Sequence, residues 1–322
     1  MKAIVQQAYG STEMLSYADA PMPVIGPDGV LIRVRSAGVD PGVWHMMTGL
    51  PLAGRLVLGV RKPKVAIRGW DVAGIVEGVG AQVTRFRRGD AVFGTTDGSF
   101  AEFACAPEQK LQIKPPNLSF EEAAALPVSG TTALTGLRDV GRIRAGQRVL
   151  VIGAGGGVGH LAVQLAKHFG AEVTGVCSAA KAEFVTGLGA DHIIDYTAEK
   201  LSGSYDLILD IAGGRSLSEL RALLTPAGTL VLGGGEGGGR ILGSTERSIR
   251  ALFVTPFLRQ RLRGLLSLPK PESLSVLTEL AGAGAVIPKI DRTFALSDAA
   301  AAVDYLVTAH PCGKVALTIG AD

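Results

Sequence analysis

The stretch VLVIGAGGGVGHLAVQLAK, residues 149–167, decides the fold. An apolar run at 150–152 predicts a strand, and apolar residues at three- and four-residue spacing from Val158 to Phe169 predict a helix. A strand, a glycine-rich turn and an amphipathic helix together are the required context of a dinucleotide-binding site. Glycines let the backbone approach a pyrophosphate, and the helix N-terminus stabilises its charge. We therefore expect phosphate contacts from Gly153, Gly156, Gly157, Val158 and Gly159.

Ala154 departs from the G-x-G-x-x-G fingerprint. If Gly156 and Gly159 are its last two glycines, Ala154 stands where the first belongs. A slightly wider turn could accept the added methyl group. The alternative is a plain strand-to-helix turn, but the flanking strand and helix patterns favour the nucleotide site.

Residues after the next predicted strand, 172–177, distinguish NADPH from NADH. An NAD site usually carries an acidic residue about 20 positions beyond the glycines, where it binds the ribose 2′-hydroxyl. Cys177, Ser178 and Lys181 occupy this region instead. A hydroxyl and an ammonium group can bind a 2′-phosphate, and no carboxylate there would repel it. We predict NADPH; the alternative is that Lys181 is only a solvated lysine in the first turn of a helix.

Strands and helices alternate through the second part of the chain, which predicts a parallel sheet with helices on both faces. The predicted strands are 148–152, 172–177, 206–211 and 229–233, and the predicted helices are 158–169, 179–188 and 216–224. This region is introduced by Ser119 and Glu122, a capping-box pattern. Residues 1 to 115 instead contain short strands with glycine and proline turns, typical of a compact β-barrel-like domain.

The C-terminal part continues with a strand-like segment at 286–294 and a helix at 298–308, for which Ser297 is the expected N-cap. The final strand GKVALTI is expected to return to the first domain. Segment 247–271 mixes arginines with large apolar residues. We interpret it as a helix with an arginine-lined solvent face; a subunit contact or a membrane-surface role stays open.

Composition excludes several function classes. The 322 residues carry a net charge of +3, too mild to indicate a nucleic-acid partner. Cys105, Cys177 and Cys312 lie far apart, which favours neither a disulfide framework nor a common zinc pattern. No signal peptide and no membrane-spanning apolar run is recognisable, so we expect a cytoplasmic protein without membrane insertion.

The chain resembles the zinc-independent, quinone oxidoreductase-like branch of the medium-chain dehydrogenase/reductases. The resemblance spans nearly all residues and is carried by LPVSGTTAL, AGQRVLVIGAGGGVGHLAVQLAK, LGADHIIDY and GKVALTI. It implies a GroES-like β-barrel domain formed by 1–118 and 285–322, and an α/β Rossmann domain with a doubly wound parallel sheet at 119–284. The family pattern A-x-x-G-x-x-G fits Gly153, Gly156 and Gly159, although Gly153 stands where relatives often have alanine.

The resemblance also implies roles for single residues. Ser178, Lys181 and Tyr196 match the 2′-phosphate site, with a half-buried strand-end tyrosine as the alternative reading of Tyr196. Gly233 and Gly234 match a backbone segment that passes the cofactor. Lys314 matches a lysine near the cofactor, although it could instead be a solvated strand lysine. A homodimer is also open, since dimers are common in the family.

Zinc ligands of the metal-dependent relatives are missing. Gly38-Val39-Asp40-Pro41 has no cysteine, and Gly69-Trp70-Asp71 has tryptophan in place of histidine. Asp40 and His45 would supply only two of about three ligands, so we expect no metal. Without a Lewis acid, a simple ketone is a poor hydride acceptor, whereas quinones and α,β-unsaturated carbonyls remain reactive. The candidate catalytic residues are Asp40, Trp44, His45 and Thr132, where Asp40 replaces the asparagine of many relatives.

The sequence therefore predicts an NADPH-dependent reductase of small quinones or enones. Two alternatives stay open. One is an enoyl thioester reductase. The other is an NADPH-binding regulatory protein with little turnover, which the lack of an obvious acid–base residue keeps plausible.

Overall fold

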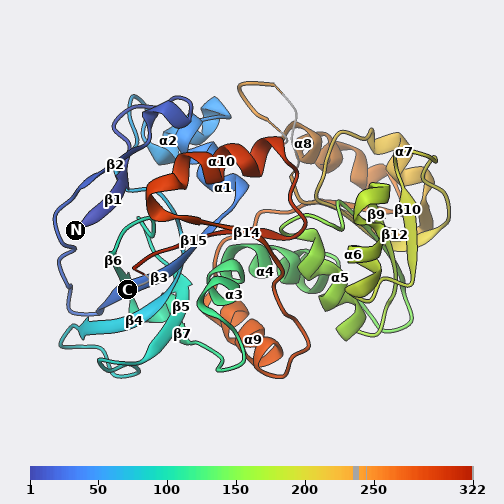
Figure 1. Ribbon diagram of the computed structural model, residues 1–322. Coiled ribbons are helices and arrows are strands. Elements are labelled where there is room, and N and C mark those ends of the chain that lie inside the picture. Colours follow the sequence, from blue (N-terminus) through green and yellow to red (C-terminus); the bar gives the residue numbers. More distant parts are fainter. Residues whose placement is uncertain (235–238, 244, 321–322) are drawn as a thin grey trace. The chain divides into compact units, whose positions relative to one another are not determined.

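The chain folds into two compact units. The structure, a computed structural model, describes residues 1–234, 239–243 and 245–320 (Figure 1). Unit 1 comprises Met1–Thr131 and Pro269–Asp322, and unit 2 comprises Thr132–Leu268. Among the described residues, no helix is both long enough and apolar enough to cross a bilayer.

Unit 1 is built mainly on antiparallel strands, although β14 pairs with β15 in parallel. Its main sheet has the order β14-β15-β3-β4-β5-β7, β6 also pairs with β3, and β1 pairs with β2. The strands are β1 (Lys2–Val5), β2 (Ser16–Asp19), β3 (Gly29–Val39), β4 (Asp71–Val79), β5 (Ala91–Thr95), β6 (Phe103–Pro107), β7 (Leu111–Ile113), β14 (Ile290–Ala295) and β15 (Lys314–Thr318). Val315 of β15 pairs with Val39 of β3, which confirms that the last strand returns to the first domain.

The core of unit 1 follows the two-residue period of β3. Val30, Ile32 and Val34 are buried and pack with Val72 and Val92 of the neighbouring strands. Unit 1 also contains helices, several of which pack on this sheet. They are α1 (Pro41–Thr48), α2 (Arg55–Leu58), α3 (Phe120–Ala125), α4 (Pro127–Leu134), which runs on into unit 2, α9 (Pro271–Gly282) and α10 (Ala299–Thr308). In Figure 1, α10 runs beside β14 and β15.

Two helix starts test the capping predictions. The Ser119 hydroxyl accepts a hydrogen bond from Glu122 N at 3.1 Å, and Glu122 accepts one from Ser119 N at 2.8 Å, so the capping box is confirmed. Ser297 is not the N-cap of α10. It lies inside a 3₁₀ turn, Leu296–Asp298, and Asp298 occupies the cap position. Helix α10 therefore begins at Ala299, after a 3₁₀ turn of the kind that often precedes α-helices.

The compact units place two segments differently from the expected domain boundaries. The domain boundaries expected from the sequence place residues 119–131 and 269–284 in the Rossmann domain. In the structure, both segments belong to unit 1. Helix α3 packs on β3 and β4, and α9 packs on β7. Asn117 Nδ2 also donates to Ala281 O at 2.8 Å. Because these helices pack on strands of unit 1, that unit extends to Thr131 and resumes at Pro269.

Unit 2 is a parallel sheet with the order β10-β9-β8-β11-β12-β13, the order of a Rossmann dinucleotide-binding fold. Its strands are β8 (Arg148–Ile152), β9 (Glu172–Cys177), β10 (His192–Asp195), β11 (Tyr205–Asp210), β12 (Leu224–Leu232) and β13 (Arg261–Gly264). Its helices include α5 (Gly159–His168), α6 (Ala182–Gly187), α7 (Leu217–Ala222) and α8 (Thr245–Val254). The order reverses between β8 and β11, so right-handed crossovers place α5 and α6 on one face and α7 and α8 on the other.

Segment 247–271 is a helix only in its first part. Helix α8 ends at Val254, a 3₁₀ turn covers Thr255–Phe257, and edge strand β13 follows. A single helix through this segment was therefore a wrong expectation. Pro256 interrupts the helical pattern, and Thr229 and Leu232 of β12 pair with Arg261 and Gly264.

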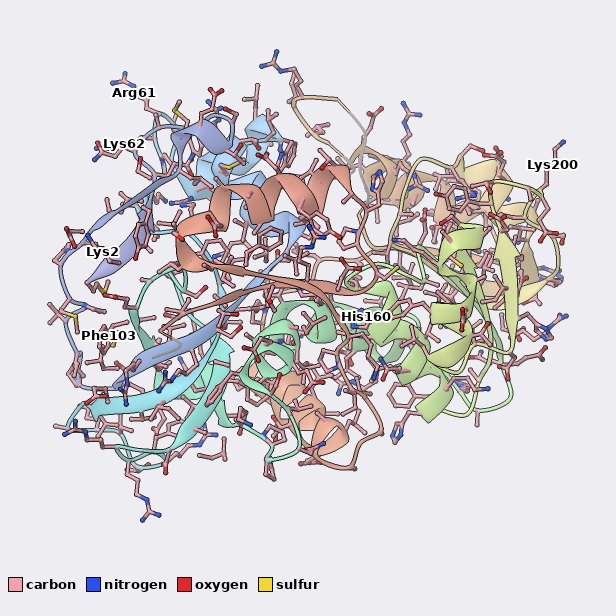
Figure 2. All side chains as sticks on the ribbon, in the orientation of Figure 1. Lys2, Arg61, Lys62, Phe103, His160 and Lys200 are labelled. Atoms are coloured by element: carbon pink, nitrogen blue, oxygen red, sulfur yellow. The ribbon has the colours of Figure 1, made fainter. Side chains whose placement is uncertain are left out.

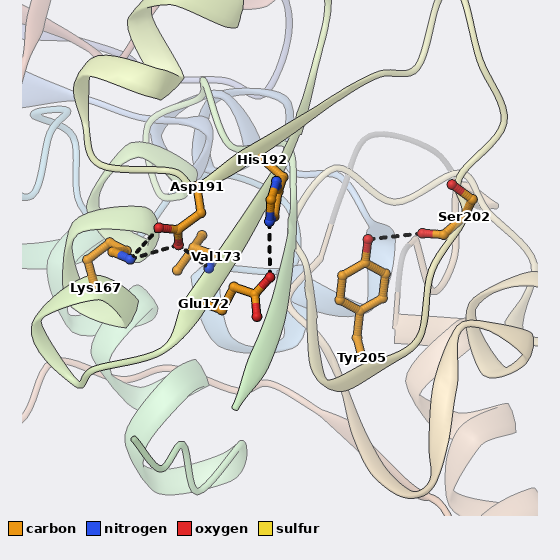
Figure 3. A network of polar contacts seen from close by, with 7 residues as sticks. All are labelled: Lys167, Glu172, Val173, Asp191, His192, Ser202 and Tyr205. Carbon is orange, nitrogen blue, oxygen red and sulfur yellow. Dashed lines mark hydrogen bonds and ion pairs between the residues drawn. The ribbon is translucent and has the colours of Figure 1, made fainter. Parts of the chain in front are cut away.

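Side-chain bonds hold the first strands of unit 2 in place (Figure 3). Lys167 of α5 binds the Asp191 carboxylate at 2.7 Å, and the same carboxylate accepts from Val173 N at 2.7 Å. His192 and Glu172 interact across β10 and β9 at 3.0 Å. Burial of Asp191 opposes its ionisation, but the bonds from Lys167 and Val173 lower the pKa overall. Helix α5 is thereby fixed to the beginnings of β9 and β10.

Candidate functional site

The glycine loop turns at Gly153 and enters α5 at Gly159. Gly153 has φ +86°, and its carbonyl accepts a hydrogen bond from Gly156 N at 3.1 Å. A Cβ on Gly159 would lie 2.0 Å from Gly153 O, so no larger residue fits there. A Cβ on Gly156 would find only Gly153 O, at 3.5 Å, so this position is open. The loop therefore combines close packing with one accessible glycine, as phosphate binding requires.

Ala154 is accommodated by a second glycine. Its side chain is fully buried, and its N donates to Val176 O at 3.1 Å. A Cβ on Gly175 would lie 3.2 Å from the Ala154 methyl group. The methyl group thus packs against β9 beside Gly175. The expected widening of the turn is not needed, because Gly175 supplies the space.

The predicted 2′-phosphate residues gather at the ends of β9 and β10. Ser178 follows β9, and its carbonyl accepts from Lys181 N at 2.9 Å. Tyr196 follows β10, is half exposed, and donates its N–H to Cys177 O at 3.2 Å. A Cβ on Gly155 would lie 2.7 Å from Lys181 Cδ, so the lysine side chain extends along the glycine loop. The structure therefore brings Ser178, Lys181 and Tyr196 to one edge.

One carboxylate near this edge was missed in the sequence. Asp195, the last residue of β10, accepts from Thr197 N at 2.9 Å and from the Thr197 hydroxyl at 2.7 Å. The hydroxyl bond, the Thr197 N–H and the Ala179 N–H lower the pKa of Asp195. An acidic residue is expected directly after β9, but Asp195 ends the neighbouring strand β10. The register Asp195 to Cys177 brings the second strand end beside the first.

His160, labelled in Figure 2, contacts the glycine loop from the first turn of α5. It is fully buried in the first turn of α5, and its Nδ1 lies 3.0 Å from Gly156 O. Its ring also faces Phe184 of α6 at 6.5 Å between centroids. His160 therefore has a structural position that fixes the carbonyl side of the loop.

A buried ion pair lies at the ends of β11 and β12. Asp210 is fully buried, accepts from Gly213 N at 3.0 Å, and pairs with Arg247 of α8 at 2.7 Å. Gly233 N donates to the Asp210 carbonyl at 2.8 Å, and Gly234 has φ +112°. The backbone segment expected to pass the cofactor is thus anchored on Asp210. The sequence offered Arg247 only as one of several arginines, and its partner lies 37 residues away.

Unit 1 holds a second polar cluster, formed by Asp40, Asp71, Lys314 and Ser129. Lys314 is buried and donates from Nζ to Ser129 Oγ at 3.0 Å. The pairing of Val315 with Val39 sets Lys314 next to Asp40 in the sheet register. The alternative of a solvated Lys314 is therefore wrong.

Asp40 caps helix α1. Its Oδ1 accepts from Gly42 N at 2.7 Å, and its Oδ2 is buried without a hydrogen-bond partner among the described residues. The neighbouring Trp70 packs on the same turn, since a Cβ on Gly42 would lie 2.7 Å from the indole ring. An indole therefore lies where the resemblance leads one to look for a zinc-ligand histidine.

Asp71 is the second buried acid of this cluster. Its Oδ1 accepts from Val128 N at 3.1 Å, and its Oδ2 has no partner in the described part of the chain. Burial raises the pKa of Asp71 well above 3.8, Lys314 opposes this rise, and Asp40 adds to it. A buried carboxyl with a raised pKa can hold a proton at neutral pH.

The other predicted catalytic residues occupy two helices. Trp44 of α1 packs against the core of unit 1, with its ring 5.1 Å from the exposed His45 ring. His45 Nδ1 lies 2.8 Å from Leu50 O. Thr132 lies in α4 and is partly exposed. No group of three His, Cys, Asp or Glu side chains in the described residues could hold a metal ion.

Known proteins share this architecture and sequence. The alcohol dehydrogenase GroES-like domain model matches residues 26–116, and the zinc-binding dehydrogenase model matches 188–317. A chloroplastic quinone-oxidoreductase homolog of Spinacia oleracea is 32% identical, covering 98% of this chain and 97% of its own. The chloroplastic NADPH-dependent alkenal/one oxidoreductase of Arabidopsis thaliana is 37% identical over 66% of this chain and 58% of its own.

A solved structure gives the same result. The quinone oxidoreductase from Coxiella burnetii superposes with a TM-score of 0.86 at 30% identity, covering 99% of both chains. The expected GroES-like and Rossmann architecture is thereby confirmed. The chain belongs to the medium-chain dehydrogenase/reductase family and is an oxidoreductase of its quinone oxidoreductase-like group.

Proposed function

We propose that the chain is an NADPH-dependent reductase that transfers hydride to quinones or α,β-unsaturated carbonyls without zinc. The observation that carries the cofactor assignment is the position of Lys181 along the glycine loop, beside Ser178 and Tyr196. An ammonium group and hydroxyls at that edge can bind the three oxygens of a 2′-phosphate.

The residues of unit 2 fit a dinucleotide. Gly156 leaves space for a phosphate, and the loop leads into the N-terminus of α5, where the helix dipole favours negative charge. Gly233 and Gly234 carry the chain past the end of β12 with the support of Asp210. When bound, NADPH supplies the hydride from its nicotinamide ring. The chain's task is to orient that ring and the acceptor.

Zinc independence rests on the residues of unit 1. One carboxylate oxygen of Asp40 caps α1, and Trp70 stands where the resemblance would place a zinc ligand. Substrates must then be electrophilic without a Lewis acid, which selects quinones and enones over simple ketones. The Arabidopsis relative named for alkenals and enones and the spinach relative named for quinones support this acceptor class.

Asp71 is our candidate for holding a proton in unit 1. Its buried carboxyl has a raised pKa and lies against Lys314 and Asp40. We infer a positioning role for Asp71 and Lys314, which lie against Asp40 at the start of α1. Trp44, His45 and Thr132 remain candidates for contact with the substrate.

The test is NADPH oxidation against quinones, enones, enals, saturated ketones and enoyl-CoA esters, before and after treatment with a chelator. We expect turnover of quinones or enones, none of saturated ketones, and no effect of the chelator. Faster turnover of enoyl-CoA would identify a thioester reductase. Tight NADPH binding without any turnover would identify a binding protein. Cytoplasmic location and a homodimer stay predictions, which cell fractionation and light scattering test.

A further inference from the structure

Helix α8 presents its apolar residues outward. Ile249, Leu252 and Phe253 recur at three- and four-residue spacing, and Phe257 continues the row in the following 3₁₀ turn. Phe253 is 71% exposed and Phe257 is 87% exposed. A surface helix normally turns such a row toward the core. We call these four residues the α8 stripe.

The inward side of α8 is polar or small. Arg247 pairs with buried Asp210, and Ala251 is fully buried. The Thr255 hydroxyl donates to Ala251 O at 2.7 Å and to Leu262 O at 3.0 Å. These bonds fix the rotation of the helix, so the α8 stripe cannot turn inward without breaking a buried ion pair. The exposure is therefore built into the fold.

Arginines surround the α8 stripe. Residues 240–268 contain six arginines and one acidic residue, Glu246, although the whole chain has a net charge of only +3. Arg250 lies beside Ile249, where it binds Glu246, and exposed Arg259 lies two residues beyond Phe257. Arg261 and Arg263 alternate with buried Leu262 in β13, so they lie on the opposite face from the core. Arg250 and Arg259 are thus exposed arginines that flank the stripe residues in the sequence.

We propose that the α8 stripe and these arginines form a docking surface for an anionic lipid bilayer. An outward apolar row with phenylalanines and flanking arginines is the pattern of helices that lie in the membrane interface. Arginine can reach the headgroups while phenylalanine enters the acyl boundary. A second copy of the chain is less suited to cover the stripe, because a two-fold contact would bring two arginine-rich segments together.

The test uses the full chain in flotation with phosphatidylcholine vesicles, with or without phosphatidylserine. We expect binding to the phosphatidylserine vesicles and weaker binding at high salt. Phe253→Ser with Phe257→Ser should reduce binding by about tenfold for each phenylalanine. Arg259→Gln should reduce it about fivefold on phosphatidylserine vesicles only.

Matched controls separate docking from folding and self-association. Leu56 and Val57 of unit 1 are similarly exposed, at 77% and 74%, so Leu56→Ser with Val57→Ser should leave vesicle binding unchanged. Thermal unfolding should match the wild type for every variant. No binding to either vesicle, or equal binding by the phenylalanine variant, would overturn the proposal. So would a lipid-free dimer that dissociates when Phe253 and Phe257 are replaced.

Discussion

The side chain of Lys181 lies along the main chain of Gly155, so close that a Cβ on Gly155 would come within 2.7 Å of Lys181 Cδ. This contact joins the end of β9 to the loop that would hold the pyrophosphate. In the proposed function, this one side chain is the physical basis for preferring NADPH to NADH.

Replacing Lys181 should weaken NADPH binding selectively. A hydrogen bond to a charged group is worth about 1.5–3 kcal/mol, so Lys181→Ala should weaken NADPH by roughly 10- to 100-fold and NADH by less than about threefold. Fluorescence titration of both nucleotides measures this. Lys200→Ala, an exposed lysine of the same unit, is the control and should change neither. An equal loss for both nucleotides would show that Lys181 does not read the 2′-phosphate.

Two glycines of one loop should respond differently to alanine. Gly159→Ala places a Cβ 2.0 Å from Gly153 O, so overpacking should lower the free energy of unfolding by about 2 kcal/mol or more. Gly156→Ala meets no atom closer than 3.5 Å and should preserve stability while weakening NADPH at least about tenfold, because the methyl group fills the phosphate approach. Urea unfolding and nucleotide titration separate these effects. Unchanged NADPH affinity in Gly156→Ala would place the phosphates elsewhere.

Asp71 should make stability fall with rising pH. Its pKa is near 3.8 in the unfolded chain and well above this in the fold, so the folded state binds more protons between the two values. The free energy of unfolding then decreases as pH rises from about 4 through the folded pKa, and levels off above it. Asp71→Asn removes this decrease. Urea unfolding from pH 5 to 8 should show wild type and variant converging toward acid; parallel curves would contradict the raised pKa.

The Asp210–Arg247 pair should be costly to break from one side. Arg247→Met leaves a fully buried carboxylate without its cation, which costs about 3–5 kcal/mol. The exposed pair on the same helix, Arg250 with Glu246, should contribute only about 0.3–0.5 kcal/mol, so Arg250→Met is the control. Asp210→Asn with Arg247→Met should regain part of the loss. Similar losses for the two single variants would mean that water reaches Asp210.

Local patterns predicted much of the architecture. The boundaries of β8 and β9 follow from apolar runs bounded by turn signals, and the start of α3 follows from its capping box. Strands β10 and β13 were missed because four residues are too few for a reliable period. Helices α3 and α9 belong to unit 1 because of their contacts with its strands, and no local sequence pattern predicts such contacts.

Sequence spacing located the glycine loop, whereas Asp195 and Asp71 could not be singled out from the sequence. Gly153, Gly156 and Gly159 are fixed by backbone geometry, which sequence spacing reports directly. Asp195 lies beside Ser178 only through the pairing of β10 with β9. Asp71 and Lys314 are 243 positions apart in sequence and meet only when β15 returns to β3. Pairings of this length leave no pattern within one chain.

Initial rates with NADPH and with NADH, measured with one quinone acceptor and wild-type protein, test the proposed function most directly. An NADPH-dependent quinone or enone reductase should show kcat/KM at least about tenfold higher for NADPH, equivalent to about 1.4 kcal/mol of selective binding. Equal values for the two nucleotides, or no oxidation of either in the presence of quinones and enones, would contradict the proposal.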